Sequence, residues 1–221
     1  MRLIPAIALL LGCGPISDLQ RDRVEVAIRQ WNLTLDPEPL SRVEVISIPG
    51  SSLLCAAIID YLREWSGTFG VYHVSDGVVD WQAGVKEEPV EQSIHRIRCF
   101  KWRALQGPVI EVLGITHMGN GYLYLYELRG RQLELLLRTP AVDFNANPDR
   151  FRNGVLEITY DSSRSSLLPD VVLAGAIEVL AEQEEKVLRS FPCQRRFSWD
   201  PSLRQYREEL SQRVGFLEGS D

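Results

Sequence analysis

No stretch of this 221-residue sequence is long and apolar enough to cross a bilayer as a helix. The apolar run at residues 3–11 holds only nine residues, whereas a membrane-spanning helix needs roughly 20. Low-complexity tracts and regular repeats are also absent. The hydrophobic and charged fractions, 45% and 24%, are those of a globular protein, so disorder is not expected.

Positive charge is in short supply. Lys and Arg number 24 against 30 Asp and Glu, which gives a formal net charge of −6. Phosphate binding needs a basic face, so the composition argues against nucleic acid as a partner. Two basic runs remain, and both lie among apolar residues: Arg195-Arg196, and the alternating Arg96, Arg98, Lys101 and Arg103. We predict that both are solvated strand faces.

The motifs of the common catalytic classes are missing. The sequence has no Gly-x-Ser-x-Gly, no Ser-x-x-Lys and no glycine-rich phosphate-binding loop. His73 and His95 fall inside expected strands without an acidic or thiol partner at ligand spacing, and zinc needs at least three ligands. His117 precedes a turn, and Asp143 and Asp149 lie in a polar loop. We therefore expect no metal and no cofactor.

Cysteine is scarce and shows no metal or redox spacing. The four cysteines are Cys13, Cys55, Cys99 and Cys193, and none belongs to a Cys-x-x-Cys pair. If Cys13 carries lipid, the remaining three permit one disulfide at most. Their neighbours are apolar, so buried free thiols are at least as well supported as a bridge, and both alternatives stay open.

A short apolar segment ends in a cysteine near the start of the chain. Arg2 supplies one positive charge, residues 3–11 are apolar, and Leu10-Leu11-Gly12-Cys13 follows. These four residues resemble the lipobox of bacterial lipoproteins, and the resemblance covers the first thirteen residues. It implies that residues 1–12 are a signal peptide and that Cys13 is acylated, with palmitate for example. The alternative is a buried strand, but Gly12, Gly14 and Pro15 break regular structure at once.

The lipoprotein resemblance also implies a location. A lipid on Cys13 would make the membrane of a bacterial cell envelope the first partner of the chain. Enterobacterial lipoproteins retained in the inner membrane carry an aspartate after the cysteine, and Gly14 stands there in this sequence. The resemblance therefore implies the outer membrane rather than the inner one.

The rest of the chain predicts one helix and then strands. Ser17-Asp18-Leu19-Gln20 is a capping box, and the apolar residues at 24, 27, 28 and 31 form one stripe on a helix of about four turns. Prolines at 37 and 39 follow it. We expect residues 13–40 to be a lipid-anchored helix and linker. Residues 41–221 are expected to be one antiparallel β domain, sandwich-like or propeller-like.

Turn residues between alternating runs predict the order of the strands. Asp76-Gly77 is a strong hairpin signal, because both turn positions favour positive φ. Residues 109–137 predict a three-strand meander whose middle strand carries Tyr122, Tyr124 and Tyr126 on one face and leucines on the other. Bulky residues on both faces predict a central strand covered on both sides. Asp200-Pro201, with apolar residues at 203, 206, 210 and 214, predicts a short C-terminal helix.

Residues 156–175 resemble a single FG-GAP or VCBS-type propeller repeat. In that family a strand leads into an aspartate-rich calcium loop, and an apolar strand ending in glycine follows. Asp161 and Asp170 match the first and last ligand positions, but Ser163 and Ser165 replace the middle acids and the loop is one residue longer. Calcium needs several oxygen ligands and negative charge, so we expect no calcium site.

Two classes of function follow from the sequence. The favoured one is a lipid-anchored envelope protein whose β domain binds or scaffolds an envelope protein or glycan without catalysis. The alternative is an envelope hydrolase with a site assembled around His117 and Asp143. A cleft that joins His117 to two carboxylates would favour the hydrolase, whereas an exposed aromatic or apolar patch would favour binding.

Overall fold

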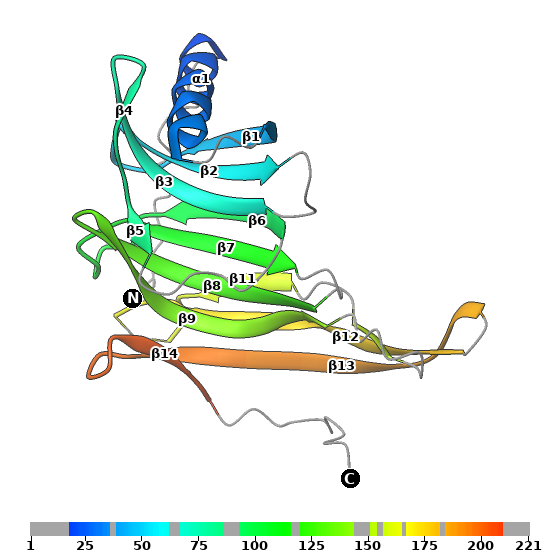
Figure 1. Ribbon diagram of the computed structural model, residues 1–221. Coiled ribbons are helices and arrows are strands. Elements are labelled where there is room, and N and C mark those ends of the chain that lie inside the picture. Colours follow the sequence, from blue (N-terminus) through cyan, green and yellow to red (C-terminus); the bar gives the residue numbers. More distant parts are fainter. Residues whose placement is uncertain are drawn as a thin grey trace.

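In the part of the chain that it describes, the computed structural model is a stack of one helix and three β-sheets, with the helix at one end (Figure 1). It describes residues 18–35, 39–61, 67–85, 93–115, 120–143, 151–153, 157–164, 167–181 and 184–209. Three apolar cores separate the layers: between the helix and sheet A, between sheets A and B, and between sheets B and C. The predicted mainly β fold, with antiparallel sheets after one N-terminal helix, is confirmed.

The helix α1 (Asp18–Leu35) covers the outer face of sheet A. Its apolar stripe buries Ala27 and Ile28 against the sheet. α1 continues past the expected end near residue 31 because Asn32 is buried and bonded there. The Nδ2 of Asn32 donates to the Ile28 carbonyl at 2.8 Å and to the Tyr72 hydroxyl at 3.3 Å. Within the described residues, no helix combines the length and apolarity needed to cross a membrane.

Sheet A is a four-stranded antiparallel meander. Its strands, in spatial order, are β1 (Leu40–Ser47), β2 (Leu54–Tyr61), β3 (Gly67–Ser75) and β4 (Val78–Gln82). The predicted hairpin is confirmed, since Asp76 and Gly77 join β3 to β4 with φ of +52° and +77°. The ring of Tyr72 lies across Gly70, where an added Cβ would come within 2.5 Å of ring atoms. Gly70 therefore makes the space in which Tyr72 is buried beneath α1.

Sheet B lies between the other two sheets and is covered on both faces. In spatial order its strands are β5 (Gly84–Val85), β9 (Gln132–Asp143), β8 (Asn120–Arg129), β7 (Val109–Ile115) and β6 (Ser93–Phe100). Among the strand pairs that the structure describes, only the two-residue pairing of β5 with β9 is parallel. Along β8, Tyr124 and Tyr126 pack towards sheet A, whereas Leu123 and Leu125 pack towards sheet C. The prediction of a central, doubly covered strand is therefore confirmed.

Sheet C closes the other end of the stack. Its strands are β10 (Phe151–Asn153), β11 (Glu157–Asp161), β12 (Asp170–Ala181), β13 (Glu184–Asp200) and β14 (Gln205–Glu208). β12 pairs with β10, β11 and β13, and β13 pairs with β14. Figure 1 shows β12 and β13 as a long ribbon that extends beyond the other layers.

The predicted C-terminal helix is wrong within the described residues, because residues 201–204 form a turn that leads into β14. Asp200 accepts the backbone N–H of Ser202 at 2.9 Å, as the cap of a helix would. Arg204 then takes a φ of +54°, a left-handed conformation that closes a hairpin. Tyr206 is buried in the core between sheets B and C, which holds the segment as a strand. Residues 210 and 214 lie outside the described residues.

Cys55 and Cys99 are free thiols. Cys55 on β2 packs in the core beneath α1, and Cys99 on β6 packs against the core between sheets A and B. Burial raises the pKa of each thiol to about 12. The side chain of Cys193 lies outside the described residues, so its pairing is not addressed.

The raised pKa values predict that native Cys55 and Cys99 react slowly. Folding favours the neutral thiols, so this contribution to stability is complete below the unfolded-state pKa and is lost as the pH rises towards 12. At about pH 8, the thiolate fraction should fall on the order of a thousandfold on folding. In a Cys13→Ala, Cys193→Ala background, both thiols should react far more slowly with a thiol reagent in buffer than in denaturant. Similar rates in the two conditions would contradict their burial.

Candidate functional site

The structure describes few of the residues that the sequence singled out for function. Cys13, His117 and Asp149 lie outside the described residues, and only the backbone of Asp143, at the end of β9, is described. The described part of the chain thus neither assembles nor separates the His117–Asp143 pair. Among the described side chains, no group of three His, Cys, Asp or Glu residues is arranged to hold a metal ion.

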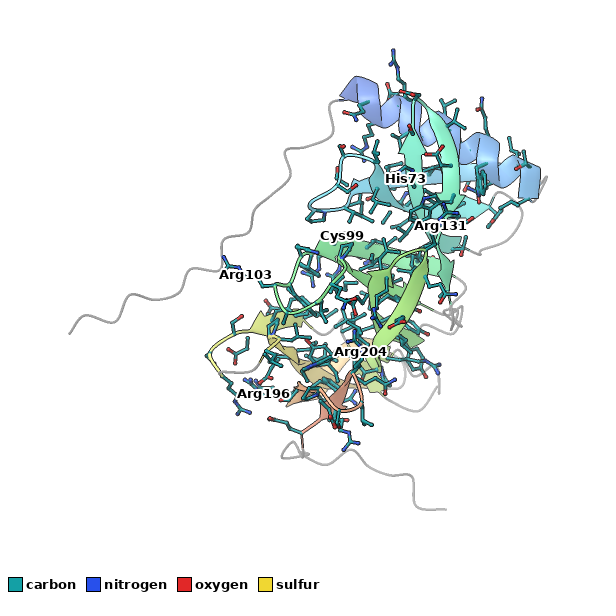
Figure 2. All side chains as sticks on the ribbon, turned by 90° about the vertical axis from the view of Figure 1, so that its left-hand side faces the viewer. His73, Cys99, Arg103, Arg131, Arg196 and Arg204 are labelled. Atoms are coloured by element: carbon teal, nitrogen blue, oxygen red, sulfur yellow. The ribbon has the colours of Figure 1, made fainter. Side chains whose placement is uncertain are left out.

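His73 has an acidic partner, contrary to the prediction from its sequence neighbours. Its Nδ1 lies 2.7 Å from Oδ2 of Asp80, across the β3–β4 hairpin. A register shift makes Asp80 the extra residue of β4, next to Trp81, the Cα partner of His73. The ring of His73 stacks on that of Trp81 with the ring centroids 5.4 Å apart. The guanidinium of Arg131 lies 5.5 Å from the centroid of the Trp81 ring. Figure 2 shows His73 and Arg131 on one side of the stack. His95 is exposed on β6.

The row of tyrosines on β8 is part of the core. Tyr124 stacks on Tyr126 with ring centroids 5.9 Å apart and planes 5° from parallel. Both rings are buried against sheet A. At the end of the row, the guanidinium of Arg138 lies 4.9 Å from the ring centroid of Tyr122. The preference for a packing role over an exposed binding surface is confirmed.

The two aspartates that matched the calcium loop are bound by an arginine. Nη1 of Arg196 donates to Oδ2 of Asp161 and to Oδ2 of Asp170, each at 2.8 Å. Hydrogen bonds from Ser163, and then from Arg196, lower the pKa of Asp161 to about 2. The guanidinium of Arg196 therefore supplies the positive charge that balances the two carboxylates. Arg196 is paired and largely covered, so the prediction of a solvated strand face is wrong for it.

The strongest candidate site is centred on Glu111, whose side chain is fully buried in the middle of β7. Arg98 binds it with two hydrogen bonds, from Nε to Oε1 at 2.7 Å and from Nη2 to Oε2 at 2.5 Å. The hydroxyl of Tyr160 donates to Oε2 at 2.5 Å. Nη2 of Arg96 lies 3.2 Å from Oε1. We call these four residues the Glu111 site. Arg96 and Arg98 stay partly exposed, so the prediction of a solvated face missed their pairing with Glu111 rather than their contact with solvent.

A β-bulge in β6 turns Ile94 into the core, and the regular alternation after it places both arginines on the same face as Glu111. The register between β6 and β7 shifts at His95, which is the extra residue. Ile94 and Ile97 therefore both pack in the core between sheets A and B, although strict alternation would put them on opposite faces. Arg96 and Arg98 reach Glu111 from the other face of the strand. Bulges commonly redirect side chains in this way next to functional sites.

Aromatic rings pack around the Glu111 site. The ring of Tyr160 lies 5.0 Å from that of Phe100 and 5.5 Å from that of Trp102, both in edge-on geometry. The guanidinium of Arg98 lies 5.6 Å from the Phe100 ring centroid and 5.8 Å from that of Tyr160. Such contacts stabilise a cation and limit its exchange with water.

The charges of the site favour binding over proton transfer. Burial, and then the negative charge of Glu111, raise the pKa of Tyr160 well above its ordinary value. Burial alone would lower the pKa of Arg98, but the hydrogen bonds and charge of Glu111 outweigh it and raise that pKa. Tyr160 and Arg98 therefore remain hydrogen-bond donors. Because Glu111 already accepts three hydrogen bonds, it is poorly placed to act as a base.

A second buried carboxylate, Glu127 on β8, has a structural role. Its Oε1 accepts the backbone N–H groups of Gln106 at 2.9 Å and Gly107 at 3.1 Å. Its Oε2 accepts from Nη2 of Arg204 at 2.7 Å. Glu127 thus fixes the loop between β6 and β7 to the β13–β14 turn. The sequence reasoning missed Glu111 and Glu127. The available signal was a single glutamate inside an otherwise apolar strand, which implies a buried partner.

In comparisons with known proteins, no protein-family model, no curated protein and no solved structure matches this chain.

Proposed function

We propose that the protein is a bacterial lipoprotein, anchored to the cell envelope by lipid at Cys13, whose β domain binds a partner without catalysis. Leu10-Leu11-Gly12-Cys13 carries the anchoring part of the proposal. Only residues 14–17 separate Cys13 from α1, and this tether spans at most about 18 Å. The helix end of the stack would therefore lie near the bilayer. Gly14 favours the outer membrane, by analogy with enterobacterial lipoproteins.

The pairing of polar groups supports a binding or scaffolding role. Several charged side chains of the described residues are ion-paired, Arg196 with two aspartates and Arg98 with Glu111, and His73 contacts Asp80. Such pairs fix the positions of the strands that carry them, and a binding or scaffolding surface needs a fixed shape. Sheets B and C lie on the far side of sheet A from α1 and include the Glu111 site (Figure 1). A soluble envelope protein or glycan would meet this end of an anchored stack first.

The anchoring is tested by Cys13→Ala. We expect this variant to accumulate as an uncleaved precursor and to take up no labelled palmitate, because the acceptor sulfur is gone. Cys193→Ala, which removes a different cysteine, serves as the matched control and should be labelled like the wild type. Equal labelling of Cys13→Ala and wild type would refute the anchor.

A further inference from the structure

We propose that the Glu111 site binds an oxyanion, the carboxylate or phosphate group of a ligand, through Arg96 with Arg98 beside it. The proposal rests on the non-catalytic binding role and assigns the ligand chemistry of that role. Three observations carry it: the unused donors of Arg96, the excess of positive charge, and the exposure of the two arginines.

Arg96 is not needed to hold Glu111. Arg98 and Tyr160 already supply three hydrogen bonds to the carboxylate, at 2.5 to 2.7 Å. Nη2 of Arg96 is at ion-pair distance from Oε1, 3.2 Å, but its N–H groups are not directed at that oxygen. Nε and Nη2 of Arg96 are shielded from solvent and have no hydrogen-bond acceptor among the described residues. Shielded donors without an acceptor are costly, and an oxyanion would satisfy them.

The site has more positive than negative charge. Two guanidinium groups face one carboxylate, and Tyr160 remains a neutral donor. A partly buried cation is stabilised by an anion that it can bind directly. The planar fork of an arginine matches two oxygens of a carboxylate or phosphate. The two parallel, charge-assisted hydrogen bonds that result are stronger than hydrogen bonds between neutral groups.

The exposure of the residues defines which of them meets the anion. The side chains of Arg96 and Arg98 are 37% and 36% exposed, whereas Glu111 is 0% exposed. The exposed parts of Arg96 do not include its Nε and Nη2, which are shielded, so Arg96 has to rotate away from Glu111 before these donors meet an anion from solvent. Arg96 turns from Glu111 to the anion, and Arg98 keeps its two bonds to Glu111. The rings of Phe100 and Trp102, stacked 6.0 Å apart, are available to the body of an attached ligand.

Thermal unfolding of the purified wild-type protein tests the site, with inorganic phosphate and acetate as probes. Each replaces chloride at constant ionic strength. At a few-fold excess of anion over its Kd, the Tm should rise by about 2–4 °C. A rise with phosphate alone supports a phosphate ligand, and a rise with acetate as well supports a carboxylate. No rise with either anion would overturn the proposal.

Two variants separate specific binding from general salt effects. Phosphate stabilises many proteins by exclusion from their surface, and that effect is common to all variants. Arg96→Gln should lose the specific rise and remain folded in chloride, because Glu111 keeps three hydrogen bonds. Arg103→Gln removes the same charge from the exposed loop after β6 (Figure 2) and should keep the rise. Equal rises in wild type and Arg96→Gln would contradict the proposal.

A further variant applies if Arg96→Gln does not fold. Arg96→Lys keeps the charge and loses the planar fork, so a smaller rise supports the proposal and an undiminished one opposes it. Palmitate labelling at Cys13 involves none of these residues. The anchoring and the anion site therefore succeed or fail separately.

Discussion

Replacing Gly107 with alanine is expected to lower the free energy of unfolding by about 3–5 kcal/mol. A Cβ at Gly107 would lie 1.7 Å from the carbonyl oxygen of Leu128, a backbone atom of β8, so the loop has to move away. Its movement breaks the hydrogen bond from Gly107 N to Oε1 of Glu127 and the one from Leu128 N to the Pro108 carbonyl. Glu127, which is fully buried, then loses part of its hydrogen bonding.

Guanidinium unfolding of the Gly107→Ala variant measures this loss. The matched control is Gly84→Ala on β5, because a Cβ there meets its nearest neighbour, the carbonyl oxygen of Arg131, at an ordinary 4.0 Å. The control should change the free energy of unfolding by no more than about 1 kcal/mol. If the two variants were equally stable, the close approach of the loop to β8 would be wrong.

Arg98→Leu should cost about 2–4 kcal/mol of stability, because it removes both charge-assisted hydrogen bonds of the bidentate pair with Glu111. The expected loss of stability is smaller than the full cost of leaving the buried Glu111 carboxylate unpaired, because Arg98 is 36% exposed and Arg96 remains near the carboxylate. Arg96→Leu should cost about 1 kcal/mol or less, because Arg96 makes no aligned hydrogen bond with Glu111. Chemical denaturation of both variants measures the difference.

A double variant separates the pair from its surroundings. In Arg98→Leu with Glu111→Leu the buried carboxylate is absent, so the protein should regain about 1 kcal/mol or more over Arg98→Leu alone. Equal stability of the single and double variants would mean that Glu111 tolerates the loss of its partner. The bidentate pair would then contribute little to the fold.

The strands that could be predicted are those whose turns have local causes. An Asp-Gly pair favours the positive φ that Asp76 and Gly77 adopt, so their hairpin is visible in the sequence. The central position of β8 was predictable for a similar reason, since bulky side chains on both faces require two covering layers. The helix expected after Asp200 failed because the same cap also starts a tight turn. The burial of Tyr206 decides between the two.

The Glu111 site escaped prediction because it depends on which elements lie side by side. Arg96 and Arg98 alternate on one face of β6, and Glu111 lies on the same face because β6 pairs with β7. Tyr160 comes from β11 of another sheet, a neighbour that the residues of β6 do not reveal. The arginines therefore looked like an exposed alternating row. The contact of His73 with Asp80 did have a local signal, because a hairpin that turns at Asp76 and Gly77 brings these two residues to the same place on β3 and β4.

Because sheet B is covered on both faces, every substitution in β8 has to fit two layers at once. Its tyrosines contact sheet A and its leucines contact sheet C. By contrast, α1 packs on sheet A alone, and the outer face of sheet C carries paired charges such as Arg196 with Asp161. Variation is therefore least costly at the two ends of the stack. Substitutions at the ends leave the Glu111 site unchanged, since its two arginines and its carboxylate lie on β6 and β7 of the middle sheet.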